Sequence, residues 1–183
     1  MTSSPLWQPT AAAIAASNLQ RFRNFINQRQ GAALADYPAL YQWSVEQIED
    51  FWAGLWDFCE IRASRRWDRV LQDGNRMPGA RWFAGSRLNF AENLLRRRDA
   101  ADALVFRGED GISRRISFAE LYRVVAQLAA TLRQLGVQPG DRVVGFMPNL
   151  PQTVIAMLAA TSIGAVWSSC SPDFGIQGVL DRF

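Results

Sequence analysis

The residues of this chain whose types could do chemistry gather in one short stretch near its carboxyl end. Positions 168–173 read Ser-Ser-Cys-Ser-Pro-Asp, which places three hydroxyls, a thiol and a carboxylate within six residues. A nucleophilic role for Cys170 would require a base partner, and the chain contains no histidine. The alternative is a polar turn whose Ser and Asp side chains satisfy backbone amides and cap the following helix.

The rest of the chain is equally short of catalytic groups. All 20 basic residues are arginine, so neither an imidazole nor a lysine amine is present. Histidine is the usual acid–base group near neutral pH, and lysine is the usual mobile cation on a transferring phosphate or carboxylate. The two cysteines, Cys59 and Cys170, have no metal-ligand spacing. We therefore expect no catalytic residue and no metal site in this chain.

A strand–helix–strand unit must position the polar stretch. Residues 142–147 predict a strand, Pro151 suits the first turn of a helix, and residues 165–168 predict a second strand. A helix between two strands makes a right-handed parallel crossover. Because ligands of parallel sheets bind beyond the carboxyl ends of the strands, residues 146–149 and 168–173 form the candidate binding edge.

The elements before this unit are also marked in the sequence. Residues 103–108 and 113–116 predict two strands of a hairpin joined by an Asp-Gly turn. Ser117 and Glu120 form a capping box at the start of a long helix, and Gly136 has the position expected just past its end.

The N-terminal part is helical and rich in tryptophan. A pattern typical of a helix precedes Gly31, Tyr37-Pro38 predicts a break, and Ser44 with Gln47 forms a second capping box. Behind it runs an apolar stripe at helical spacing: Val45, Ile48, Phe51, Trp52, Leu55, Trp56 and Cys59. The stripe predicts a helix face packed on a larger body, and an aromatic cage for a ligand is the alternative.

A change of composition near residue 99 predicts two domains. Six of the seven tryptophans precede residue 83, Asn89 can cap a short helix, and the regular α/β pattern begins after residue 99. We place a mostly helical extension at residues 1–99 and the beginning of an α/β domain with a mixed or parallel sheet at residues 100–183.

Composition excludes several classes of function. With 49% hydrophobic and 20% charged residues, the chain is globular. Its arginines are scattered among acids, which argues against nucleic-acid binding. The longest apolar stretch, residues 154–170, contains a glycine turn and does not predict a membrane span. The N-terminus lacks the basic region of a secretory signal, so we expect a cytoplasmic protein.

Four segments resemble one enzyme family, the acyl-adenylate-forming acid–CoA ligases. They are residues 82–95 (WFAGSRLNFAENLL), 116–121 (ISFAEL), 140–149 (GDRV followed by MPN) and 163–175 (IGAVW followed by SSCSPDFG). The second and third are similar to segments shared across the family. The first and fourth are narrower, and the fourth is similar to members that use acetoacetate, whereas acetyl-CoA synthetases typically carry a Gly-Gly-Phe-type loop there.

The resemblance implies a two-step reaction and small-molecule partners. The acid and ATP, with Mg²⁺, form an acyl-adenylate and pyrophosphate, and CoA then displaces AMP. The implied acid is acetoacetate, with acetate or propionate as the alternative. In this family the phosphate loop, the adenine and ribose contacts and the catalytic lysine lie downstream of the region that resembles this chain. The resemblance therefore implies the N-terminal part of an incomplete adenylate-forming ligase fold, inactive by itself.

The resemblance also gives one candidate site. Ser171, Pro172 and Asp173 are similar in position to the family segment that lines the pantetheine channel for CoA. Pro172 and Asp173 replace a pair of small glycines found in acetyl-CoA synthetases, which changes the expected contact. The alternative from another class is a stand-alone interaction module that docks a protein partner on its tryptophan-rich face.

Overall fold

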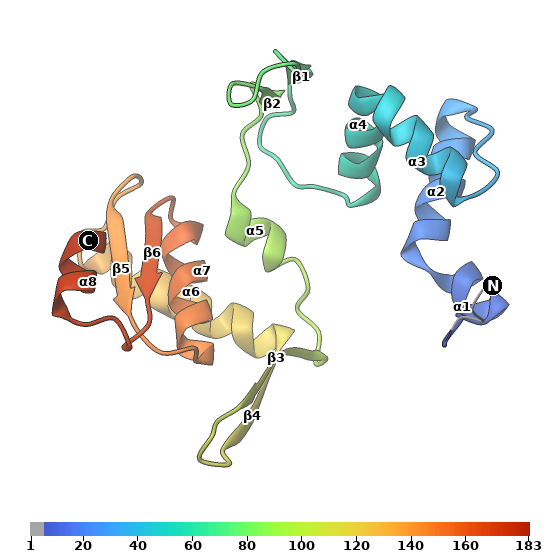
Figure 1. Cartoon of the computed structure of the whole chain (residues 1–183). Helices are drawn as coiled ribbons and strands as arrows, with labels where there is room; N and C mark the ends of the chain where they lie inside the picture. Colours follow the sequence, from blue (N-terminus) through green and yellow to red (C-terminus); the bar gives the residue numbers. More distant parts are fainter. Residues whose placement is uncertain (1–5) are drawn as a thin grey trace. The chain divides into compact units, whose positions relative to one another are not determined.

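The computed structural model describes residues 6–183, which divide into two compact units (Figure 1). The first unit holds the described chain up to Ile61 together with Arg65–Ser86, and the second holds Arg62–Ser64 and Arg87–Phe183. The division into units follows from contacts within the chain and does not test the domain boundary predicted near residue 99, which stays a prediction. A helical N-terminal part followed by an α/β part is the fold class that the sequence predicts.

The first unit consists of four helices and one hairpin. These are α1 Ala11–Ala16, α2 Asn18–Gln30, α3 Tyr37–Glu46, α4 Ile48–Phe58, β1 Arg69–Gln72 and β2 Arg81–Ala84. The side chain of Ser17 caps α2 by accepting from the Gln20 N–H at 3.1 Å. Gly31, at φ 66°, ends α2 where the sequence predicts a stop. Strands β1 and β2 pair antiparallel.

Two local predictions for this unit are wrong. Tyr37-Pro38 begins α3 instead of breaking the chain, because proline suits the first turn of a helix and Asp36 caps it by accepting from the Ala39 N–H at 2.9 Å. Ser44 lies inside α3 and caps nothing, and α4 begins after Gln47 without a side-chain cap.

Aromatic rings fill much of the first unit. Phe22 of α2 meets Phe51 and Phe58 of α4 in edge-on contacts with ring centroids 5.7 and 5.2 Å apart. Trp56, which is 9% exposed, contacts Trp67 at 4.7 Å. The aromatic stripe of α4 is thus mainly a packing face, as predicted.

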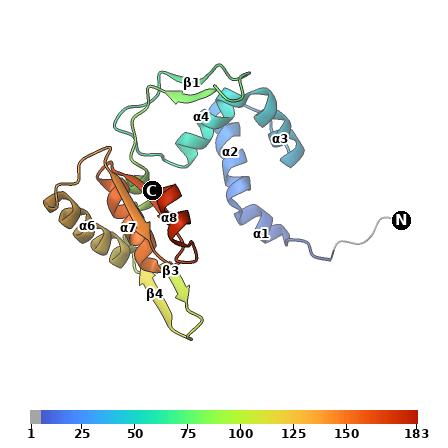
Figure 2. The ribbon, with the colours of Figure 1, turned by 60° about the vertical axis from the view of Figure 1, so that its left-hand side comes forward.

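The second unit contains four strands and four helices. They are α5 Phe90–Leu94, β3 Asp102–Arg107, β4 Ser113–Ser117, α6 Phe118–Gln134, β5 Arg142–Phe146, α7 Pro151–Ser162, β6 Val166–Cys170 and α8 Ile176–Arg182. Strands β3 and β4 form an antiparallel hairpin that extends away from the helices of its own unit (Figures 1 and 2). Strands β5 and β6 pair in parallel, with Val143 opposite Trp167 and Phe146 opposite Cys170.

Aliphatic side chains form the core of the second unit. Ile116 of β4, Val125 of α6 and Leu158 of α7 are at most 2% exposed. Val143 and Trp167 bring the sheet against the same cluster. The capping box at Ser117 forms as predicted, with its side chain accepting from the Glu120 N–H at 3.1 Å. In the part of the chain that is described, no helix is both long and apolar enough to cross a membrane.

Candidate functional site

The parallel pairing of β5 and β6 brings the two predicted loops to one edge of the sheet. The Met147 N–H donates to the Cys170 carbonyl at 3.2 Å, one step beyond the last paired residues of the strands. Residues 147–149 and 171–173 therefore leave the sheet next to each other. This is the edge at which parallel sheets bind their ligands.

The loop Ser171–Asp173 is a closed polar turn. The Ser171 hydroxyl donates to the Asp173 carboxylate at 2.8 Å and accepts from the Asp173 N–H at 3.4 Å. The Phe174 N–H donates to the Ser171 carbonyl at 3.1 Å. Pro172 and Asp173 are exposed, so both can meet a ligand.

The expectation that this turn caps the next helix is wrong. The residue that precedes α8 is Gly175, and α8 has no side-chain cap. Ser171 and Asp173 bind each other instead, and Phe174 separates them from the helix. The polar groups of the loop are thus used within the loop or turned to solvent.

Cys170 is unsuited to nucleophilic chemistry in this setting. Its side chain is 6% exposed at the end of β6. A thiol acts as a nucleophile through its thiolate, which needs an electropositive and accessible setting or a base partner. Burial and the absence of histidine from the sequence both favour a packing role.

An apolar groove lies directly beside the loop. Phe146 at the end of β5 and Phe174, Gly175, Ile176, Val179 and Leu180 of the α8 segment surround about 340 Å³. The groove offers an apolar wall to any chain-like ligand that passes the exposed side of Pro172. It contains no charged residue that could fix a phosphate.

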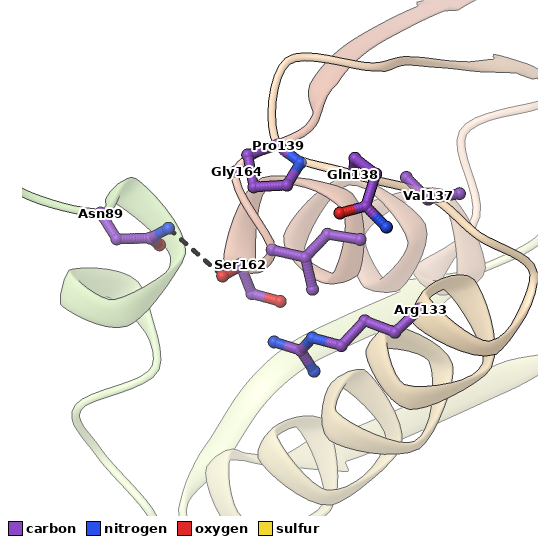
Figure 3. A pocket seen from close by; sticks show the side chains of 8 residues that line it. Asn89, Arg133, Val137, Gln138, Pro139, Ser162 and Gly164 are labelled. Atoms are coloured by element: carbon purple, nitrogen blue, oxygen red, sulfur yellow. Dashed lines mark hydrogen bonds between the residues drawn. The ribbon is translucent and has the colours of Figure 1, made fainter.

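A larger pocket of about 570 Å³ lies at the opposite end of the strands (Figure 3). Its lining residues come from α6, α7, the two turns that enter β5 and β6, and the cap of α5: Asn89, Arg133, Val137, Gln138, Pro139, Ser162, Ile163 and Gly164. Asn89 donates to the carbonyls of Thr161 at 2.9 Å and Ser162 at 3.4 Å, and Figure 3 shows the latter bond.

Sequence reasoning missed this pocket and part of the role of Asn89. Its carboxamide oxygen caps α5 as predicted, accepting from the Glu92 N–H at 3.0 Å. Its amide group reaches α7, 72 residues further along the chain. A local capping signal cannot reveal a partner at that separation, and Arg133 was indistinguishable from other helix-end arginines.

Comparison with known proteins places the chain in a family. The profile of the family described as AMP-binding enzyme matches residues 90–181, half of the chain. The chain belongs to the AMP-binding enzymes. The profile of the acetyl-coenzyme A synthetase N-terminus matches residues 37–94. Family membership confirms the fold class, an N-terminal extension followed by the first part of the adenylate-forming ligase fold.

Several proteins that are similar to this chain are named acetoacetyl-CoA synthetase. The chain is 48% identical over 98% of its length to the acetoacetyl-coenzyme A synthetase of Rhizobium meliloti (strain 1021), and 37% identical over 97% to the malonamoyl-CoA synthetase of Penicillium aethiopicum. The solved acetoacetyl-CoA synthetase from Streptomyces lividans matches 99% of this AMP-binding chain with a TM-score of 0.88 and 47% identity. The chain spans about 27% of the Rhizobium protein and 28% of the Streptomyces chain.

Proposed function

We propose that this chain forms the N-terminal part of a ligase that joins acetoacetate to CoA with ATP. A carboxylate oxygen of the acid attacks the α-phosphorus of ATP, which gives an acyl-adenylate and pyrophosphate. The CoA thiolate then attacks the acyl carbon, and AMP leaves. The observation that carries the proposal is the 48% identity over 98% of the chain to an acetoacetyl-coenzyme A synthetase.

The names of the relatives narrow the class of acid. Acetoacetate and malonamate, the acids named by two relatives, are both short acids with a second carbonyl β to the carboxyl group. An acid of this class is therefore the proposed substrate, and acetate and propionate, which lack the second carbonyl, are the alternatives.

Within this ligase we propose that Ser171, Pro172 and Asp173 line the channel for the pantetheine arm of CoA. Support comes from the position of the loop at the carboxyl end of β6 and from the apolar groove beside it. Pantetheine is a mostly uncharged chain, which an apolar wall and backbone groups can hold without a cation. Its charged nucleotide end would need residues from elsewhere in the ligase.

The remaining assignments belong to the same proposal. Residues 1–99 are the extension and residues 100–183 begin the large domain, so the first adenylation step uses groups outside this chain. ATP enters as its Mg²⁺ complex, but residues 6–183 contain no cluster of His, Cys, Asp or Glu that could hold the ion, and none is assigned to it. The cytoplasmic location expected from the sequence belongs to the same proposal.

A chimera tests the function. Residues 1–183 replace the matching quarter of the Streptomyces lividans enzyme, and acetoacetate-dependent pyrophosphate release and acyl-CoA formation are measured. We expect both with acetoacetate and little with acetate or propionate. A folded chimera that releases no pyrophosphate with acetoacetate would contradict the proposal. The 183-residue chain by itself should show no ATP–pyrophosphate exchange.

A second experiment in the chimera tests the loop. Replacing Pro172 and Asp173 with glycine should change the KM for CoA by several-fold and leave ATP–pyrophosphate exchange unchanged, because the first step does not use CoA. The matched control is Gln177→Ala in the neighbouring helix, which removes only an exposed bond to Asp181. An equal loss in both steps would indicate a folding effect and count against a CoA channel.

A further inference from the structure

The larger pocket of the second unit contains one charged side chain, that of Arg133. The other seven lining residues are uncharged, and no carboxylate is among them. Its volume of about 570 Å³ is in the range of small-molecule sites. Figure 3 shows the Arg133 guanidinium extending along the floor of the pocket below Ser162.

The Arg133 guanidinium has no acceptor within the described part of the chain. The side chain of Arg133 is exposed to solvent, and none of the hydrogen bonds and ion pairs among residues 6–183 involves it. Arg123, ten residues earlier on α6, contrasts with it by donating to the Gln127 side chain at 3.1 Å. An arginine in the last turn of a helix can bind the terminal carbonyls of that helix. Arg133 can bind a ligand instead only if other groups already donate to those carbonyls.

Backbone amides already satisfy several of these carbonyls. At the end of α6, the Leu132 carbonyl accepts from Val137 N–H and the Arg133 carbonyl from Gly136 N–H, both at 3.0 Å. At the end of α7, the Thr161 carbonyl accepts from Gly164 N–H at 3.1 Å in addition to the Asn89 amide. The negative ends of both helices are therefore largely compensated without Arg133.

We propose that this pocket binds a small oxyanion, a carboxylate or phosphate group, on the Arg133 guanidinium. The planar fork of arginine matches two oxygens of either group. The Gln138 amide, which makes only a long bond to the Gly136 carbonyl at 3.5 Å, supplies a neutral donor beside it, whereas the Ser162 hydroxyl donates to the Ala159 carbonyl at 2.7 Å. Val137, Pro139 and Ile163 form an apolar wall against the rest of the ligand.

The site is independent of the proposed CoA loop. Gln138 and Pro139 precede β5 and Ile163 and Gly164 precede β6, whereas Ser171–Asp173 follows β6. The pocket and the loop thus lie at opposite ends of the same two strands. Oxyanion binding here can be tested without any activity of the ligase.

Titration of the ¹⁵N-labelled 183-residue chain tests the proposal. Inorganic phosphate and acetate are added separately while sodium chloride keeps the ionic strength constant, and the amide signals of Gln138 and Gly164 are followed. We expect saturable shifts with a dissociation constant in the millimolar range. Arg133→Gln should weaken binding by about tenfold or more. The matched control Arg123→Gln should leave it unchanged.

The outcomes separate the two sources of the oxyanion. Saturation with phosphate alone indicates a phosphate site, saturation with acetate alone a carboxylate site, and saturation with both a general oxyanion site. Amide shifts that rise linearly with the concentration of the added anion would show charge screening and overturn the proposal. An equal loss of binding in Arg133→Gln and Arg123→Gln would overturn it as well. If Arg133→Gln fails to fold, Arg133→Lys replaces it and should weaken phosphate binding by removing the two-oxygen contact.

Discussion

The core of each compact unit is built from a different kind of side chain. In the first unit, rings from separate segments meet edge to edge, as in the Phe22–Phe51 and Trp56–Trp67 contacts. In the second unit, aliphatic side chains at regular helix and strand positions form the core, with Val125 and Leu158 each 2% exposed. In the second unit, the spacing of apolar residues along each helix and strand indicates which side chains enter the core. In the first unit, the core depends on contacts between aromatic rings that are far apart in the sequence.

The largest expected effect comes from emptying each core in turn. Ile26 of the first unit is 0% exposed and Ile116 of the second is 1% exposed. Replacing either by alanine should lower the free energy of unfolding by about 2–5 kcal/mol. Denaturant unfolding measures the loss, with Ile14→Ala at an exposed position as the control. Amide shifts in ¹H–¹⁵N spectra should stay within the unit that carries the change, and shifts across both would contradict separate cores.

A substitution in the second unit adds volume instead of removing it. A Cβ at Gly145 would lie 2.6 Å from Cη2 and 2.8 Å from Cζ2 of Trp167, so the indole must move. Gly145→Ala should cost about 1–3 kcal/mol of unfolding free energy. Both atoms belong to the outer ring of the indole, so the cost should shrink in a Trp167→Phe background. A cost that is the same in both backgrounds would point to the backbone of β5 rather than the ring contact.

The first unit also depends on a shared ion pair. Asp57 of α4 accepts from Arg29 at 2.8 Å and from Arg66 at 2.7 Å, and its side chain is 14% exposed. Asp57→Asn should cost about 1–2 kcal/mol, since both arginines are half exposed and screened by water. Asp68→Asn is the matched control, because that carboxylate pairs with Arg65 at 65% exposure. Equal losses in thermal unfolding for the two variants would show that the shared pair adds nothing.

The same contrast explains how far the sequence could predict the structure. In the second unit, Ser117 caps α6, Pro151 begins α7 and β5 pairs with β6 in parallel, all as local signals indicate. In the first unit, Ser44 does not cap a helix, because α3 continues through it. Asp36 caps α3, but residue 39 is an alanine, so no capping box marks this helix start in the sequence.

The candidate loop was placed at the correct edge of the sheet by strand polarity, since the carboxyl ends of β5 and β6 meet there. Its internal geometry was not predictable, because Ser171 could have bonded either to Asp173 or to the amides of α8. The pocket around Arg133 is assembled from α5, α6 and α7, and no local pattern brings those three together.

The smallest expected effect concerns a surface pair in the second unit. Asp99 accepts two bonds from the Arg97 guanidinium, at 2.9 and 3.0 Å, and one from the Ala101 N–H at 2.9 Å. The Arg97 bonds, followed by the Ala101 bond, lower the pKa of the Asp99 carboxyl below its usual value. Because the pKa is lower in the folded chain, the pair stabilises the fold above the usual aspartate pKa and ceases to do so as the pH falls through the lowered value.

A carboxyl-carbon NMR titration checks this assignment. The Asp99 midpoint should lie below the usual aspartate pKa, and Arg97→Gln should raise it. Arg98→Gln is the control, because Arg98 lies over the Tyr122 ring at 3.7 Å and has no bond to Asp99. A midpoint that Arg97→Gln leaves in place would assign the lowered pKa to the Ala101 amide. The ion pair would then be a surface contact without a measurable role, unlike the shared pair at Asp57 in the first unit.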